Sequence, residues 1–311
     1  MTPAPAPETL EAVRRIILRH KRHDMAFALT GLFCLMLGVL AFSTLFLQML
    51  LEGAPRLSLA FFSEFPSRHA EQAGILSAWV GSALVMSVTI CVAVPLGVGA
   101  GLYLEEYAPK NLLTEVIEIN VTNLAGVPSI IYGLLALGVF VYRFGLGQSI
   151  LAAGLTLALL ILPVVIVATR EAIRAIPAYI REAAYACGAT RWQVMRDHIL
   201  PYSLPGILTG VIIGLARAIG ETAPVITIGA MTFIAFLPPA PFAGTPPAGL
   251  LDWLLSPFTV MPIQMFNWTS RPEEAFHQNA AAAGLVLLLM TLSMNGLAIW
   301  LRHRVRQHVK W

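Results

Sequence analysis

Six long apolar segments constrain this chain more strongly than any other feature of its sequence. A helix rises about 1.5 Å per residue, so roughly 20 apolar residues are needed to cross the hydrocarbon core of a bilayer. The segments that reach this length are residues 25–51, 78–104, 118–142, 149–169, 205–236 and 277–301. Only 12% of the residues are charged, whereas soluble domains carry about 25%. The sequence therefore predicts an all-α integral membrane protein with six transmembrane helices.

Lysine and arginine gather on one side of these spans. Of the 20 such residues, fifteen lie in the N-terminal tail, in the loops after spans two and four, and at the C-terminus, whereas four lie on the other side. Short loops rich in positive charge stay in the cytoplasm. We therefore expect both termini in the cytoplasm.

The chain is expected to contain a tail, a membrane domain and a second tail. Residues 1–24 form a cytoplasmic tail in which residues 10–22 can fold as a short basic amphipathic helix, although a plain topology signal explains their charge equally well. Residues 25–301 form the transmembrane domain, and residues 302–311 a basic cytoplasmic tail. Within the domain, residues 236–276 form a Pro-rich outer loop. Trp253 and Trp268 of this loop are expected at the membrane interface.

The loop between spans four and five is too long for a turn and too polar to span a membrane. Pro177 can open a helix, and Gly188 suits its left-handed C-terminal cap. Thr190 and Gln193 fit a capping box that starts a second helix, which we expect to end at Pro201. The pattern predicts a helix–Gly–helix hairpin. Its small apolar contact surface would comprise Ala183, Ala184, Tyr185 and Trp192.

Two opposite charges, Arg217 and Glu221, interrupt the otherwise apolar fifth span. A charged side chain near the bilayer centre costs roughly 2.5 to 3.5 kcal/mol on insertion scales, so such residues usually face a bundle interior or a wet pathway. Four residues apart on one helix, the two can pair while the guanidinium still offers donors to an anion. An ion pair that only fixes helix packing is the alternative.

Helical phasing separates two faces of the fifth span. At roughly 100° per residue, Gly206, Gly210 and Gly214 share a face with the charged pair. Glycines at this spacing let neighbouring helices approach closely. The opposite face carries aliphatic residues that suit lipid, namely Leu208, Ile212, Leu215, Ile219 and Ile226. We therefore expect the charged pair to point toward protein or a pathway.

Other polar positions give weaker indications of function. Asn123 and Ser129, near the start of span three, could line a pathway, although capping and cross-linking of helices explain them more simply. The sequence has no P-loop of the form GxxxxGK[ST], no HExxH and no GxSxG. Its three cysteines lack the spacing of a zinc site or a disulfide framework. We expect this chain to be no enzyme by itself and to hold no cofactor or metal.

The hairpin sequence resembles the EAA motif of bacterial ABC importer permeases, through Glu182-Ala183-Ala184, Gly188 and Leu200-Pro201. The resemblance implies the type I importer permease fold, also called MetI-like. It makes residues 170–204 a coupling loop that docks on a cytoplasmic ATPase subunit. The coupling residues would be Glu182, Ala183, Ala184, Tyr185, Gly188, Thr190 and Trp192.

Residues 216–224 (ARAIGETAP) resemble the signature of phosphate-specific ABC permeases of the PstA type, as do residues 103–108 and 126–130. The resemblance implies a permease of the bacterial inner membrane, surrounded by lipid, whose cargo is inorganic phosphate. It gives Arg217 and Glu221 a role in phosphate passage. The implied partners are a PstC-like permease, a PstB-like ATPase dimer that binds ATP and Mg, and a PstS-like phosphate-binding protein.

Three other functions stay open from the sequence. The chain could be an ABC permease for another oxyanion or a phosphonate. It could also be a gated anion channel or a secondary carrier, although the hairpin argues against both. A membrane-embedded enzyme such as a lipid phosphatase would need clustered Arg, His and Ser residues, which this sequence does not show.

Overall fold

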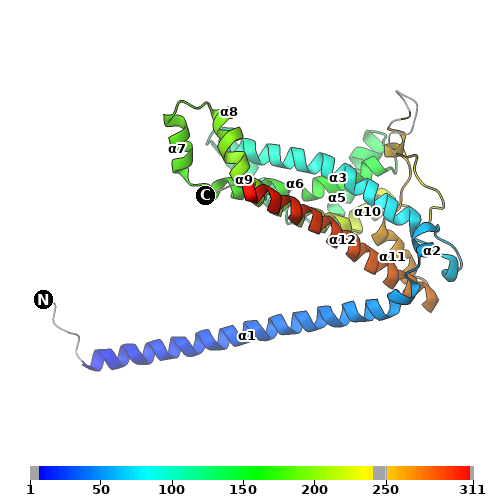
Figure 1. The fold of residues 1–311 in the computed structure, drawn as a ribbon, viewed down its shortest axis with the longest axis horizontal. Coiled ribbons are helices and arrows are strands. Elements are labelled where there is room, and N and C mark those ends of the chain that lie inside the picture. The colour runs from blue at the N-terminus through cyan, green and yellow to red at the C-terminus, as the bar shows by residue number, and fades with distance from the viewer. Residues whose placement is uncertain (1–6, 241–248, 250, 309–311) are drawn as a thin grey trace. The chain divides into compact units, whose positions relative to one another are not determined.

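A computed structural model of the chain describes residues 7–240, 249 and 251–308, with side chains from residue 20 to residue 304 of these ranges. Every regular element in these ranges is a helix (Figure 1). The chain divides into two compact units, Met1–Leu51 and Glu52–Trp311. The prediction of an all-α membrane protein is confirmed, because five helices are long and apolar enough to cross a membrane and a bent pair would make a sixth.

Helix α1, Pro7–Gly53, is continuous over 47 residues. Proline is tolerated at its start, where the missing N–H would have no partner. No glycine or proline follows until Gly31, so nothing in the backbone interrupts the basic segment. We expected residues 10–22 to form a short helix of their own, and this prediction was wrong. The segment is instead the first part of the long helix α1. Residues 1–6 of the predicted tail lie outside the described residues.

Four long helices build the core of the second unit. They are α3 (Leu76–Leu102), α6 (Ile150–Arg174), α9 (Leu200–Gly220) and α12 (Glu274–His308). Helix α6 packs against both α3 and α9, and α9 packs against α12 (Figure 1). Their shared core is aliphatic, with Val85, Leu157, Ile161, Val165 and Leu215 among the buried residues. The second, fourth and sixth predicted spans correspond to α3, α6 and α12.

The third predicted span is not straight. It consists of α4 (Leu112–Leu124) and a second helical stretch, Ser129–Arg143, and the two meet at 107°. The second stretch begins as α5 (Ser129–Ala136) and ends as the π-helical segment η4 (Leu137–Arg143). Pro128 disfavours helical backbone at Val127, and it stands as the cap residue before α5. The Tyr132 hydroxyl donates to the Leu124 carbonyl oxygen at 2.7 Å and so ties the two helices across the bend. A single helix over residues 118–142 was therefore the wrong prediction.

The fifth span begins earlier and ends earlier than predicted. Helical backbone runs from Arg191 to Gly220, so Pro201 does not end the second hairpin helix. A π-helical turn, η5 (Met195–Ile199), directly precedes Pro201. The wider turn accommodates a proline that a regular helix interior would not. A separate short helix, α10 (Ala223–Ile228), follows the span instead of continuing it to residue 236.

Five further short elements lie at the end of the bundle that carries Arg56 and Ser149. They are η1 (Ala54–Arg56), α2 (Leu59–Ser63), η2 (Ala70–Gln72), η6 (Asp252–Leu255) and α11 (Met261–Thr269). Trp268 is fully buried and packs on Phe61, with ring centroids 6.0 Å apart. Trp253 is also buried. The prediction that both indoles lie at the membrane interface was therefore wrong. Residues 241–248 and 250 of the predicted outer loop lie outside the described residues.

Candidate functional site

The charged pair forms, although not within one helix. Helix α9 ends at Gly220, and Glu221 has extended backbone with φ −74° and ψ 122°. Pro224, in the first turn of α10, has no N–H with which to continue the helix. The Nε of Arg217 still donates to Oε1 of Glu221 at 3.1 Å. The predicted i,i+4 pairing is present, but it joins the last turn of α9 to the linker beyond it.

Arg217 keeps most of its donors available. Its side chain is 39% exposed, whereas that of Glu221 is 18% exposed. Within the described residues, Arg217 donates only through Nε, which leaves both Nη groups without a protein acceptor. A guanidinium carries five N–H donors in a planar fork that matches an oxyanion. The pair is therefore a neutral unit that still presents a fork of donors.

The faces of α9 differ from the phasing prediction. Leu215 and Ile219, expected to face lipid, are buried in the core. Arg217 and Ile213 lie on the open side of the helix. The packed face contains both buried aliphatic residues and buried glycines, because α9 lies between α6 and α12 and must contact both. The charged pair consequently lies at the edge of this packed face, where the Arg217 side chain is exposed at the surface of the chain.

Two of the glycines on α9 allow it to approach α6 closely. A Cβ at Gly206 would lie 2.7 Å from the Cβ of Ala172, and one at Gly210 would overlap the Cβ of Ala168. A Cβ at Gly214 would lie 3.5 Å from the Cβ of Ile161, an ordinary contact. The close approach of the two helices therefore depends on Gly206 and Gly210.

The bend of the third span lies beside the charged pair. Helix α5 packs against α10, where a Cβ at Gly133 would lie 2.7 Å from the Cα of Pro224. Tyr132 lies within electrostatic range of Arg217. Sequence reasoning missed this tyrosine, whose only signal is a hydroxyl within an apolar run. Asn123 is exposed and Ser129 half-buried on the two sides of the bend, and the structure shows no contact from either to Arg217.

The hairpin after α6 follows its predicted local structure. Helix α7 (Ala178–Ala186) starts after Pro177, and Gly188 adopts a left-handed φ of 83°. Thr190 and Gln193 form a capping box at the start of α8 (Arg191–Val194). The left-handed turn and the capping box fix the reversal between the two helices.

The hairpin has an anchored face and an open face. Buried Ile173, Ile176, Val194, Met195 and Ile199 anchor it to the end of α6. Aromatic side chains stand open to solvent at Tyr179, Tyr185 and Trp192. A groove of about 390 Å³ lies between α7 and η5 and is lined by Tyr179, Ile180, Ala183, Ala184, Cys187, Ala189 and His198. Glu182, Gly188 and Thr190 are exposed beside it.

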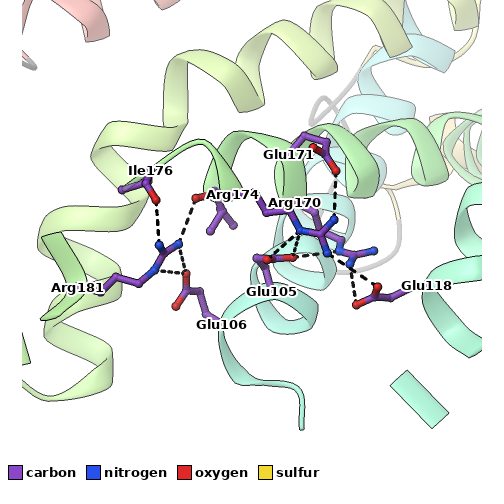
Figure 2. A network of polar contacts seen from close by, with 9 residues as sticks. Glu105, Glu106, Glu118, Arg170, Glu171, Arg174, Ile176 and Arg181 are labelled. Carbon is purple, nitrogen blue, oxygen red and sulfur yellow. Dashed lines mark hydrogen bonds and ion pairs between the residues drawn. The ribbon is translucent and has the colours of Figure 1, made fainter. Parts of the chain in front are cut away.

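A network of ion pairs joins the hairpin to the membrane helices (Figure 2). It is centred on η3 (Tyr103–Tyr107), a π-helical turn at the end of α3. The carboxylate of Glu105 accepts from Nε of Arg174 at 3.0 Å, and Glu106 accepts from Nη2 of Arg181 at 2.7 Å. Sequence reasoning missed the pairing of these two glutamates with arginines. Their arginines lie 65 to 75 residues away along the chain, so no local pattern indicated the pairing.

Among the described residues, no group of three or more His, Cys, Asp or Glu side chains is arranged to hold a metal ion. The charged groups of the two sites are instead arginine–carboxylate pairs.

Comparison with known proteins gives one family. The family described as binding-protein-dependent transport system inner membrane component matches residues 93–307. A phosphate transport system permease protein PstA of Yersinia pestis is 34% identical over 281 residues, which cover 88% of this chain and 86% of that protein. The probable ABC transporter permease protein YqgI of Bacillus subtilis is 30% identical over 279 residues, 88% of this chain and 93% of that protein.

A solved structure shares the fold. One chain of a crystal structure of a bacterial alginate ABC transporter, in complex with an alginate pentasaccharide-bound periplasmic protein, superimposes on this chain with a TM-score of 0.62. The match covers 94% of this chain and 98% of that chain at 13% identity. The expected importer permease fold is thereby confirmed.

Proposed function

Because the chain belongs to the family of binding-protein-dependent transport system inner membrane components, we propose that it carries inorganic phosphate inward as a permease subunit of an ATP-driven importer. As a member of that family it is a multi-pass inner membrane subunit of an ABC importer, and it works with an ATPase and a binding protein. Phosphate as cargo is supported by similarity to several PstA phosphate permeases, one of them 34% identical.

The proposed assembly follows from that cargo. A PstC-like permease completes the pathway, and a PstB-like ATPase dimer binds ATP and Mg below it. A PstS-like protein delivers phosphate from outside. In this assembly both termini and the hairpin face the cytoplasm, in agreement with the placement of lysine and arginine. The chain itself holds no cofactor.

The open fork of Arg217 is the observation on which the proposed mechanism depends. Glu221 holds the guanidinium through Nε, so both Nη groups can donate to a phosphate oxygen. The carboxylate also offsets the positive charge. A transport site must bind its ion well enough to admit it and weakly enough to release it. The pair thus gives a pre-oriented anion contact of moderate strength.

Alternating access completes the mechanism. ATP binding closes the ATPase dimer and moves the hairpin, whose open face carries Tyr179, Tyr185 and Trp192. The membrane helices then change their arrangement around Arg217, which is exposed first to one side and then to the other. Phosphate released by the binding protein contacts the guanidinium in between.

Uptake of labelled phosphate into liposomes that contain the assembled transporter tests this proposal. We expect Arg217→Gln to reduce the uptake rate at least about tenfold, the scale of one lost charge-assisted contact of 1.5–3 kcal/mol. The matched control is Arg143→Gln, because Arg143 is exposed and lies outside the charged pair. Near-normal uptake by Arg217→Gln would refute the role of the guanidinium. Stronger competition by sulfate or a phosphonate than by unlabelled phosphate would refute phosphate as the cargo.

A further inference from the structure

Two successive glutamates at the end of α3 hold different parts of the molecule. Glu105 pairs with α6, and Glu106 pairs with the hairpin (Figure 2). We infer that Glu105 and Glu106 are positioning residues that carry hairpin movement to the bent third span and so to the Arg217–Glu221 pair. The inference rests on the proposed function, since it concerns how ATP hydrolysis is coupled to cargo movement.

The first link joins the hairpin to α3. Nε and Nη2 of Arg181, on α7, both donate to Oε1 of Glu106, at 3.0 and 2.7 Å. Arg181 also donates to the carbonyl oxygens of Ile173 and Ile176, each at 3.1 Å. One guanidinium therefore clamps the start of the hairpin, the end of α6 and η3. The side chains of Arg181 and Glu106 are only 21% and 14% exposed, so water screens this link less than a surface pair.

The second link joins α3 to α6. Both oxygens of Glu105 accept from Nε of Arg174 at 3.0 Å, and Oε2 also lies 3.4 Å from Nε of Arg170. The side chain of Arg170 is 6% exposed, so its charge depends on these partners. Removal of one partner from a buried pair leaves the other charge uncompensated, which destabilises the arrangement that the pair maintains.

The third link reaches α4. Nη2 of Arg170 lies 2.6 Å from Oε1 of Glu118, a close ion contact that lacks the alignment of a hydrogen bond. Nη2 of Arg174 lies 3.9 Å from the other oxygen of the same carboxylate. Glu118 is in the middle of α4, the first half of the bent span. The ion pairs, joined by the backbone between Glu105 and Glu106, therefore connect the hairpin to α4.

The π-helical turn explains how neighbouring residues serve different partners. In η3 the backbone bonds span five residues, and the chain leaves it at Ala108 with extended backbone. Turns of this kind occur mainly as local insertions, often at functional sites. The wider turn directs Glu105 toward α6 while Glu106 faces Arg181 (Figure 2).

The far end of the path reaches the charged pair through packing. The hydroxyl of Tyr132 ties α5 to the end of α4, and Gly133 packs against Pro224 of α10. Pro224 lies three residues beyond Glu221 in the sequence. A shift of α4 is thus passed to the segment that holds Glu221. Close packing transmits such displacements because the contacts leave little free volume.

The first test measures phosphate moved per ATP hydrolysed by the complete transporter in liposomes. For Glu106→Gln we expect that ratio to fall about tenfold, within the usual range of coupling between sites, while ATP hydrolysis stays within about twofold. The control is Glu171→Gln, whose side chain is 64% exposed and, among the described residues, pairs only with Arg174 of its own helix, at 3.3 Å. It should leave the ratio unchanged.

A double variant tests whether Glu106 and Arg181 act as one link. If they do, Glu106→Gln combined with Arg181→Gln lowers the ratio no further than the worse single variant. If the fold-decreases of the two single variants multiply in the double variant, the two residues act independently and the inference is overturned. A ratio of phosphate to ATP in Glu106→Gln that equals that of wild type would also overturn it. Wild-type transporter that hydrolyses ATP but moves no phosphate would instead refute the proposed function.

The second test does not depend on the cargo. Spin labels are attached to Cys187, at the end of α7, and to a cysteine introduced by Thr122→Cys on α4, with Cys34 and Cys91 replaced by serine. Both label positions are exposed. We expect the distance between the labels to stay constant on addition of ATP and vanadate, and to change by several Å in Glu106→Gln. If ATP and vanadate change the distance between the labels by the same amount in wild type and in Glu106→Gln, the ion pairs only stabilise the fold.

Discussion

Single residues decide how closely α9 approaches α6 and what the charged pair can offer. Spacing alone predicted that Arg217 and Glu221 would pair, and they do at 3.1 Å. Spacing could not predict that α9 would end between them. That end depends on Pro224, whose effect on Gly220 becomes visible only when the helix is built. Whether the Nη groups of Arg217 find acceptors likewise depends on how the helices around it pack. Local sequence patterns do not predict that packing.

Replacement of Arg217 by lysine separates charge from geometry. Lysine keeps the positive charge but presents a point-like ammonium instead of a planar fork. We expect Arg217→Lys to transport phosphate more slowly than wild type and faster than Arg217→Gln, with most of the loss in apparent affinity. The measurement is the concentration dependence of uptake in liposomes. Wild-type kinetics in Arg217→Lys would mean that charge alone matters at this position.

An alanine at Gly210 should separate α9 from α6. Its Cβ would overlap the Cβ of Ala168, and overpacking of this kind costs about 1–3 kcal/mol. The gain in helix propensity is only about 1 kcal/mol, so we expect Gly210→Ala to lower the melting temperature in detergent.

Two further variants control this prediction. Ala168→Gly added to Gly210→Ala should restore the melting temperature, because it removes the overlap. Gly99→Ala should not lower it, because a Cβ there would have no neighbour within 4 Å among the described residues. A melting temperature of Gly210→Ala that equals or exceeds wild type would show that α9 can move away from α6 without loss.

At the level of elements, the sequence was most informative where the signals are local. The hairpin boundaries followed from Pro177, Gly188 and the capping box at Thr190, and the structure has all three. The prediction failed at Pro201, because proline was taken as a helix end. The π-helical turn Met195–Ile199 before it has no comparable sequence signal. The ion network was invisible for a related reason, since its partners are brought together only by the packing of α3, α4, α6 and α7.

The left-handed turn of the hairpin gives a prediction for this element. A side chain with a Cβ at the φ of 83° found at Gly188 costs roughly 1–2 kcal/mol, whereas asparagine is tolerated there better than other residues. We expect Gly188→Val to loosen the hairpin and to reduce co-purification of the ATPase subunit, with Gly188→Asn close to wild type. Equal recovery of the ATPase with both variants would show that the turn does not control docking.

At the scale of the whole molecule, the number of crossings depends on the bent third span. If α4 and α5 returned to the side from which they came, α6 would end on the side opposite to the end of α3. The structure excludes that arrangement, because Arg181 after α6 contacts Glu106 after α3 at 2.7 Å. At the other end of the bundle, the amide of Ile150 donates to the carbonyl of Ser256 at 3.2 Å, which joins the start of α6 to the loop after α10. The bent pair therefore runs from one end of the bundle to the other and counts as the sixth candidate span among the described residues.

If the bent pair crosses, the two ends of α6 lie on opposite sides of the membrane, and impermeant maleimide can test this in intact spheroplasts. Cys187 is exposed on the hairpin, and Arg68→Cys would introduce a thiol at an exposed position on the opposite end of the bundle. Since the basic segments belong to the cytoplasm, we expect the thiol at position 68 to react from outside and Cys187 to react only after the membrane is permeabilised. Labelling of Cys187 alone in intact cells would show that the chain has the opposite orientation in the membrane. Labelling of both thiols from outside would contradict the crossing of the bent pair, because the two ends of α6 would then share one side.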